Sequence, residues 1–134
     1  MNRFLFLLLG VLFLTSCQTI KTDFEEGTNP LIYFQRAQTA LDLGDFDLAI
    51  KIYDMLLATQ PGDPAIIVSA EYELAFLNYK KGNMDLAIQK FEAILKKYAD
   101  PTQAAFLDVW PQVLSLKLLS KLKPLDGPSP SPGP

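Results

Sequence analysis

The chain has 134 residues, with 15 acidic and 12 basic side chains and a net charge of −3. This length predicts one small domain, and the acidic balance argues against a nucleic-acid surface, which needs clustered Lys and Arg. The chain has no histidine and a single cysteine, which excludes an intramolecular disulfide, a His/Cys metal site and a histidine-based serine triad.

The first residues have the layout of a secretory signal. Arg3 supplies one positive charge, and an unbroken apolar run of eleven residues extends from Phe4 to Leu14. A membrane-spanning helix needs about 20 apolar residues, so this run is short for a permanent anchor. We therefore expect residues 1–16 to be a signal peptide that is removed.

The residues that follow, Leu14-Thr15-Ser16-Cys17, resemble the lipobox of bacterial lipoproteins. The resemblance implies cleavage between Ser16 and Cys17 and acylation of Cys17; an ordinary signal peptide with a chance cysteine is the alternative. Several acyl chains would hold the protein stably at a membrane. Gln18 stands where many lipoproteins of the inner membrane have aspartate, so the resemblance implies the periplasmic face of the outer membrane, with the inner membrane as the alternative.

Residues 17–29 contain the lipid site and a mostly polar stretch before the first predicted helix. We expect this stretch to be a flexible tether. A coil of about a dozen residues has an average reach of roughly 20 Å.

A pattern in the middle of the chain occurs twice. Gly-(Asp/Asn)-(apolar)-Asp-Leu-Ala-Ile begins at Gly44 and again at Gly82. Each glycine is predicted to end a helix in the left-handed conformation. Asp45 and Asn83 are predicted to cap the helix that follows. Apolar residues then recur every three or four positions, which predicts amphipathic helices.

These residues resemble the tetratricopeptide repeat (TPR) family, whose unit is a helix-turn-helix of about 34 residues. The resemblance covers about Pro30 to Pro101. It implies an all-α fold: a short TPR-like helix-turn-helix solenoid in the domain 30–123, with repeats at about 30–63 and 64–100 and a C-terminal capping helix or two. The matching positions are Ala37, Ala49, Tyr53 and Pro61 in the first repeat and Ala75, Ala87 and Phe91 in the second.

The interval from Gly44 to Gly82, which we call the repeat period, is longer than the family's usual one. The extra residues lie around Asp63 and Pro64. Asp63 reads as an N-cap followed by proline in the first turn, which predicts a long helix from Pro64 to Lys81. The long period is similar to that of TPR lipoproteins of the bacterial cell envelope, such as the component of the outer-membrane β-barrel assembly machine.

Two repeats bury too little surface alone, so residues 102–123 are predicted to form the cap. Pro111 lies within this segment and predicts a kink or a break between two short helices. Residues 124–134 contain five prolines, which predicts an extended or disordered tail. The alternative for this tail is a docking peptide for a proline-binding groove.

In the TPR family the first helices of successive repeats line a concave groove that binds peptides. The resemblance therefore implies a partner-binding groove, and the alternative is that its aromatic residues pack under the C-terminal helices. The acidic side chains of Asp42, Asp45 and Asp47 read as turn and cap residues, without the spacing of a calcium loop. The candidate groove residues are Phe34, Gln38, Leu41, Tyr72, Phe76 and Tyr79.

Together these features predict a membrane-anchored TPR lipoprotein that acts as a protein–protein interaction adaptor in the cell envelope. The alternative is a structural or assembly subunit of an outer-membrane machine for barrel assembly, secretion or transport. We expect no enzymatic activity, cofactor, metal or small-molecule substrate. The expected partners are an envelope protein or peptide and, through the lipid, a membrane.

Overall fold

The computed structural model describes residues 19–59 and 62–123 of the chain, and all regular structure in these ranges is helical. The predicted all-α fold class is confirmed. The predicted signal peptide, Ser16 and Cys17, the closing Pro61 and the proline-rich tail 124–134 lie outside the described residues. The helices are α2 (Pro30–Asp42), α3 (Phe46–Thr59), α4 (Pro64–Lys80), α5 (Met84–Tyr98), α6 (Pro101–Ala104) and α7 (Val109–Leu122).

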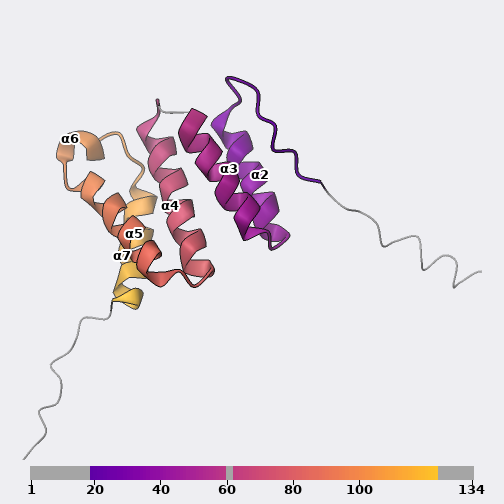
Figure 1. Cartoon of the computed structure of the whole chain (residues 1–134). Coiled ribbons are helices and arrows are strands. Elements are labelled where there is room, and N and C mark those ends of the chain that lie inside the picture. Colours follow the sequence, from indigo (N-terminus) through magenta and orange to yellow (C-terminus); the bar gives the residue numbers. More distant parts are fainter. Residues whose placement is uncertain (1–18, 60–61, 124–134) are drawn as a thin grey trace, which may run out of the picture.

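The helices form two antiparallel pairs that stand side by side (Figure 1). In the first pair α3 packs along α2, and in the second α5 packs along α4. Helix α4 also packs on α3, which joins the pairs, and α7 packs mainly on α5 and more weakly on α4. The result is a short solenoid of two hairpins followed by one further long helix.

The turns inside the two hairpins use the predicted glycines. Gly44 and Gly82 have φ angles of +77° and +84°, which a residue with a side chain adopts only with strain. Asp45 caps α3 as predicted, because its carboxylate accepts a hydrogen bond of 3.0 Å from the Leu48 amide. The prediction for Asn83 is wrong: its side chain makes no cap bond to α5.

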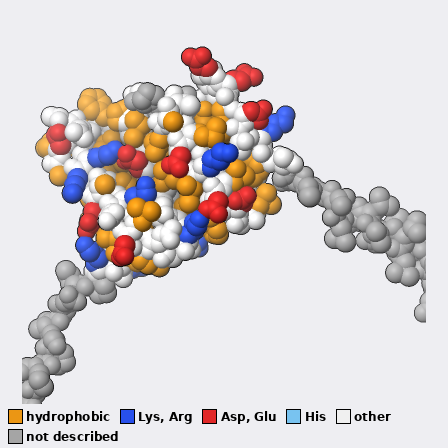
Figure 2. Space-filling view, in the orientation of Figure 1, with side chains coloured by type: hydrophobic (Ala, Val, Ile, Leu, Met, Phe, Trp, Pro, Cys, Tyr) orange, Lys and Arg blue, Asp and Glu red, His pale blue; other side chains and the backbone are white. Residues whose placement is uncertain are grey.

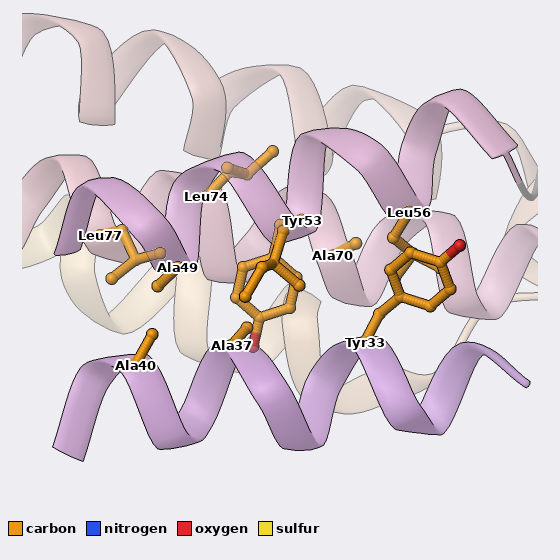
Figure 3. Packing of buried hydrophobic residues seen from close by; sticks show 10 residues of the cluster. Tyr33, Ala37, Ala40, Ala49, Tyr53, Leu56, Ala70, Leu74 and Leu77 are labelled. Carbon is orange, nitrogen blue, oxygen red and sulfur yellow. The ribbon is translucent and has the colours of Figure 1, made fainter. Parts of the chain in front are cut away.

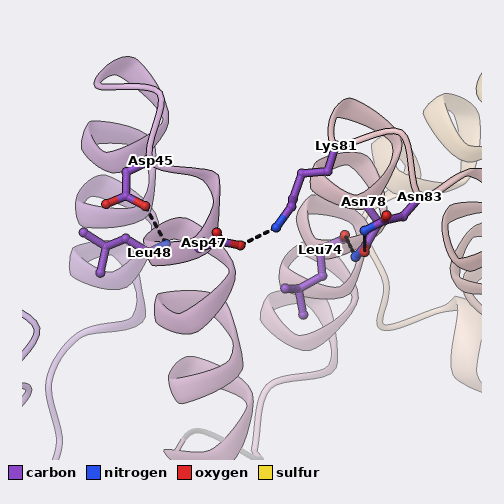
Figure 4. A network of polar contacts seen from close by, with 7 residues as sticks. All are labelled: Asp45, Asp47, Leu48, Leu74, Asn78, Lys81 and Asn83. Carbon is purple, nitrogen blue, oxygen red and sulfur yellow. Dashed lines mark hydrogen bonds and ion pairs between the residues drawn. The ribbon is translucent and has the colours of Figure 1, made fainter.

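Asn83 does not cap α5 because its side chain is turned toward a different partner. Its amide donates a hydrogen bond of 3.2 Å to the side-chain oxygen of Asn78, which is buried on α4 (Figure 4). The Asn78 amide in turn donates to the Leu74 carbonyl at 2.7 Å. A buried amide left without partners costs free energy, so this bond takes precedence over a solvent-exposed cap.

Helix α4 begins as the sequence predicts. The Asp63 carboxylate accepts a hydrogen bond of 2.9 Å from the Ala65 amide, and Pro64 occupies the first turn, where its missing N–H is not needed. The helix then extends over 17 residues to Lys80. This length lets α4 contact both its own partner α5 and the preceding α3.

The first part of the core lies between α2, α3 and α4 (Figure 3). Tyr33 of α2 and Tyr53 of α3 fill the space between the first two helices, and each is only 1% exposed. Fully buried alanines, Ala37 and Ala40 on α2 and Ala49 on α3, allow the two helices to approach closely.

A second cluster joins α4, α5 and α7. Phe91 of α5 is fully buried at its centre, and Tyr72 of α4 lies against it with ring centroids 5.7 Å apart. Leu118, Leu119 and Leu122 of α7 pack on the same cluster. Helix α4 therefore contributes residues to both parts of the core.

The chain breaks between α6 and α7 before Pro111, not at it. Asp108 stands at the N-terminus of α7, and Pro111 follows within the first turn, where a proline removes no helical hydrogen bond. The Tyr98 hydroxyl donates a hydrogen bond of 2.5 Å to the Asp108 carbonyl and fixes the loop against α5. A break between helices is present as one of the two predicted alternatives, but Pro111 does not cause it, and α7 continues past Pro111 as one helix of 14 residues.

The segment before α2 differs from the flexible tether that the sequence suggested. The ring of Phe24 stacks on Tyr33 with centroids 3.7 Å apart, and Ile20 packs on the first part of the core. Arg36 of α2 fixes the segment with two hydrogen bonds, because its Nη1 donates to the carbonyls of Lys21 and Asp23 at 2.9 and 3.0 Å. Its guanidinium also lies over the ring of Phe24. We call residues 19–29 the N-terminal strap.

The strap was missed because polar residues dominate its sequence, while two apolar side chains and one arginine determine its position. Among the described helices, none is both long and apolar enough to cross a membrane.

Candidate functional site

The predicted groove residues form two rows on different helices. Phe34, Gln38 and Leu41 lie on α2. Phe34 and Leu41 are half-buried against the first part of the core, and the Phe34 ring meets Tyr53 edge-on at 5.3 Å. Gln38 is exposed.

The row on α4 is a continuous series of aromatic rings. Tyr72 stacks with Phe76 at 6.3 Å between centroids, and Phe76 meets Tyr79 at 6.0 Å. The Lys80 ammonium lies 6.0 Å from the centre of the Phe76 ring and adds a positive charge beside the rings. Tyr72 is buried, whereas Phe76 and Tyr79 are half-buried.

Trp110 of α7 extends this row. Its ring meets Tyr72 edge-on at 5.0 Å and 79°, and its side chain remains 37% exposed. We call Trp110, Tyr72, Phe76 and Tyr79 the aromatic strip. The ring contacts therefore run along α4 to α7, whereas the α2 row packs into a separate part of the core.

Trp110 was not among the candidate groove residues, because it lies in the segment 102–123 that was predicted to form the cap. A signal for its role was present, because Phe34, Tyr72 and Trp110 follow one another at the same interval that separates Gly44 from Gly82. Trp110 thus occupies the position on α7 that Tyr72 occupies on α4. The alternative in which the C-terminal helices cover the predicted groove holds for Tyr72 and leaves Phe76 and Tyr79 partly open.

The carboxylate of Glu73 lies near the strip and is half-buried. Burial raises the pKa of Glu73 above its ordinary value. Burial, with the nearby Glu73 charge as a smaller cause, raises the pKa of Tyr72 to about 12 and raises that of Tyr53 as well. Both hydroxyls are therefore protonated at neutral pH and can act as hydrogen-bond donors.

The acidic side chains at the first turn have structural roles (Figure 4). Asp45 caps α3, and Asp47 forms an ion pair with Lys81 at the end of the second hairpin's first helix. No three acidic or thiol side chains in the described residues gather as metal ligands. Ser115, on the packed face of α7, is fully buried, and its hydroxyl has no hydrogen-bond partner within residues 19–59 and 62–123.

Surface charge is mixed over the face seen in Figure 2, where hydrophobic side chains reach the surface between lysines and acids.

The molecule also has an open cavity of about 520 Å³ beside α6 that the sequence did not predict. Its walls are mostly apolar: Pro64, Ile67, Lys97, Thr102, Gln103, Phe106 and Leu107. Such surfaces are better suited to binding the apolar side chains of another molecule than to catalysing a reaction of a bound substrate.

Comparison with known proteins agrees with the helical hairpins. The family model described as the tetratricopeptide repeat matches residues 32–63 and 69–101, close to the two hairpins of the structure. A protein of Treponema pallidum (strain Nichols), named as uncharacterized, is 33% identical over 119 residues, which is 87% of this chain and 47% of the relative. The chain thus spans about half the length of that relative. No solved structure matches the chain significantly.

Proposed function

Because the chain contains two tetratricopeptide repeats, we propose that it is a lipid-anchored adaptor of the bacterial cell envelope that holds another protein near the membrane. The observation that carries the binding role is the aromatic strip. Trp110, Phe76 and Tyr79 are partly open to solvent, although each is a large apolar ring. Trp and Tyr are enriched among the residues that carry most of the binding energy of protein interfaces.

The strip suggests the chemistry of the partner segment. Four rings in a row accept apolar or aromatic side chains, and Lys80 at one end favours a carboxylate. The half-buried Glu73 on the same helix favours a partner without an acidic side chain at that point. We propose an extended or helical peptide with apolar residues and an acidic residue at its Lys80 end.

The anchor is proposed from the sequence alone. Residues 1–17 combine a charged start, an apolar run and the lipobox-like Leu14-Thr15-Ser16-Cys17. Acyl chains on Cys17 would then hold the protein at the periplasmic face of the outer membrane, with the inner membrane as the second candidate. No enzymatic activity is proposed.

The binding role is tested by recovering partners from the source organism's envelope in mild detergent. The full chain is compared with the double variant Phe76→Ala/Tyr79→Ala and with the control Leu31→Ala, which removes an exposed apolar side chain outside the strip. We expect one partner set with wild type and control and its loss with the double variant. Equal recovery with all three proteins would refute the role of the strip.

The same experiment separates the adaptor from the second candidate, a permanent subunit of an envelope machine. A fixed ratio of partner to chain that survives extensive washing favours the subunit. Partner that dissociates from the column on dilution favours the adaptor.

The anchor has a separate test. Cys17→Ser is expected to leave uncleaved precursor and to abolish incorporation of labelled fatty acid. Processing and labelling that do not change in this variant would contradict lipidation, without bearing on the strip.

A further inference from the structure

Helix α7 has the place of the first helix of a third repeat. It packs mainly on α5 and less on α4, in the way that α4 packs on the preceding α3. Its Trp110 stands one repeat period after Tyr72 and contacts it. In the two complete hairpins, the first helix is covered on one side by the second helix of its own pair.

No helix of the described part of the chain covers that side of α7. Val109, Val113 and Leu116 are 66%, 53% and 53% exposed, and their spacing of four and three residues aligns them along one stripe of the helix. Two periods earlier, the same positions on α2 are Tyr33, Ala37 and Ala40, which are at most 1% exposed. On α2 those residues are buried because α3 lies over them (Figure 3).

The charge around the stripe selects the kind of helix that fits. Lys117 and Lys121 lie on the C-terminal half of α7, and α7 has no acidic side chain. Neither lysine forms an ion pair among the described residues, whereas Lys123 is paired with Glu92 of α5. A second copy of α7 has no acidic side chain that could pair with these lysines, so self-pairing would leave both charges uncompensated.

We propose that the Val109, Val113 and Leu116 stripe is a docking site for an acidic amphipathic helix of a partner protein, which completes the third repeat. The partner helix has small and apolar residues at intervals of three and four, as α3 does, and acidic residues at the level of Lys117 and Lys121. The five prolines among residues 124–134 are incompatible with this helix, so the tail does not supply it. The stripe shares helix α7 with Trp110 but contains none of the four rings of the aromatic strip, and the proposal does not depend on the proposed function.

A segment of the chain itself provides the probe. A synthetic peptide of residues 45–59 has three acidic side chains and one lysine, and in the fold its sequence covers the equivalent face of α2. The full chain in mild detergent is titrated with this peptide while the fluorescence of Trp110, the chain's only tryptophan, is recorded. We expect saturable binding with a blue shift of the emission, weakened by added salt.

Two variants locate the binding. Leu116→Glu places a charge in the docked surface, and we expect at least about a tenfold loss of affinity, because an unpaired buried charge costs more than the free energy of a tenfold change. The control Leu31→Glu makes the same change at an exposed leucine on α2 and is expected to bind like wild type. Circular dichroism checks that both variants remain helical.

A double variant on the surface tests the proposal even if Leu116→Glu fails to fold. Lys117→Glu/Lys121→Glu changes exposed side chains only, and it is expected to weaken the acidic peptide and to strengthen a matched peptide with its three aspartates changed to lysine. Any of three results overturns the proposal: no saturable binding, equal affinity in Leu116→Glu and wild type, or self-association of the chain that Leu116→Glu abolishes. The last result would assign the stripe to a second copy of the chain.

Discussion

Glu73 has an unusual environment for an acidic side chain on the surface of a small helical protein. It is half-buried on α4, and burial raises its pKa from the ordinary value of 4.5. A raised pKa means that the folded state binds this proton more tightly than the unfolded state does. The ionisation of Glu73 therefore lowers the free energy of unfolding as the pH rises from its unfolded-state pKa of 4.5 through its higher pKa in the folded state.

The variant Glu73→Gln removes this ionisation. At pH 7 we expect a higher Tm than in wild type, and at pH values below 4.5 we expect the difference to shrink, because Glu73 is then protonated in both states. Thermal unfolding followed by circular dichroism at pH 7 and pH 4 measures this. Glu26→Gln, at an exposed position, serves as the control. The same Tm difference at both pH values would exclude a role for the carboxylate's charge.

At the first turn, Asp42 and Asp45 lie three residues apart but differ in role. Asp45 caps α3, so Asp45→Ala is expected to lower the free energy of unfolding by about 1 kcal/mol. Asp42 is the last residue of α2, where a negative charge is unfavourable to the helix dipole. Asp42→Ala is therefore expected to be neutral or slightly stabilising. Urea denaturation compares the two, and equal losses would contradict the capping role.

Single residues were predictable where the cause is local. The conformations of Gly44 and Gly82 and the caps at Asp45 and Asp63 follow from residue type and spacing over a few positions. Asn83 was not predictable in this way. Its partner is the buried Asn78, and the burial of Asn78 depends on how α4 packs with its neighbours.

Among the elements, the N-terminal strap depends most on a few contacts. Phe24→Ala removes the stack on Tyr33 and the ring beneath Arg36. We expect the free energy of unfolding to fall by about 1–2 kcal/mol, from lost apolar contact and lost ring pairing. In hydrogen exchange, the amides of α2 should lose protection first.

Phe106→Ala is the matched control for that change, because Phe106 is 71% exposed. It is expected to alter the free energy of unfolding by less than about 0.5 kcal/mol. A loss as large as that of Phe24→Ala would mean that residues 19–29 are not held as described.

Helix α7 was predictable as an element but not as a half-repeat. Its apolar residues and Pro111 indicated a helical cap with a break nearby. No Gly-Asp turn follows it directly, so the sequence pattern that marked the other first helices was missing. The equal spacing of Phe34, Tyr72 and Trp110 was the one sequence signal of the equivalence, and the contact between the Trp110 and Tyr72 rings supports it.

At the scale of the whole molecule, α4 couples the two parts of the core. Ala70 and Leu74 face the first part, and Tyr72 and Ala75 belong to the second. A repeat protein is stabilised by such contacts between neighbouring units as well as within them. A destabilising substitution at the junction of the hairpins should therefore lower the stability of both hairpins.

Ala70→Leu tests this coupling. Ala70 is fully buried at the junction with α3, and the added atoms are expected to cost about 1–3 kcal/mol. Trp110, which contacts Tyr72 of the second cluster, should report the same lower urea midpoint as circular dichroism. Ala58→Leu, at an exposed position of α3, should leave the midpoint unchanged. A Trp110 transition that stays at the wild-type midpoint would show that the two parts unfold independently.

The repeat architecture could be predicted because the same turn and packing residues recur in both repeats. The site could be predicted only in part. Spacing placed the α2 row and the α4 row on the first helices, but it did not show that the rings of α4 continue to α7. That continuation depends on where α7 packs, which is a property of the assembled helices.

The N-terminal strap has a mechanical consequence if Cys17 bears the proposed lipid. Ile20, which is already packed on the core, comes only three positions after Cys17, so a lipid anchor would be about 11 Å or less from the folded body. A pull on the body would load the Phe24 and Arg36 contacts before any helix. Peeling off residues 20–29 would then extend the attachment by about 30 Å. Under force the strap would detach from the body first, and the repeats would remain folded.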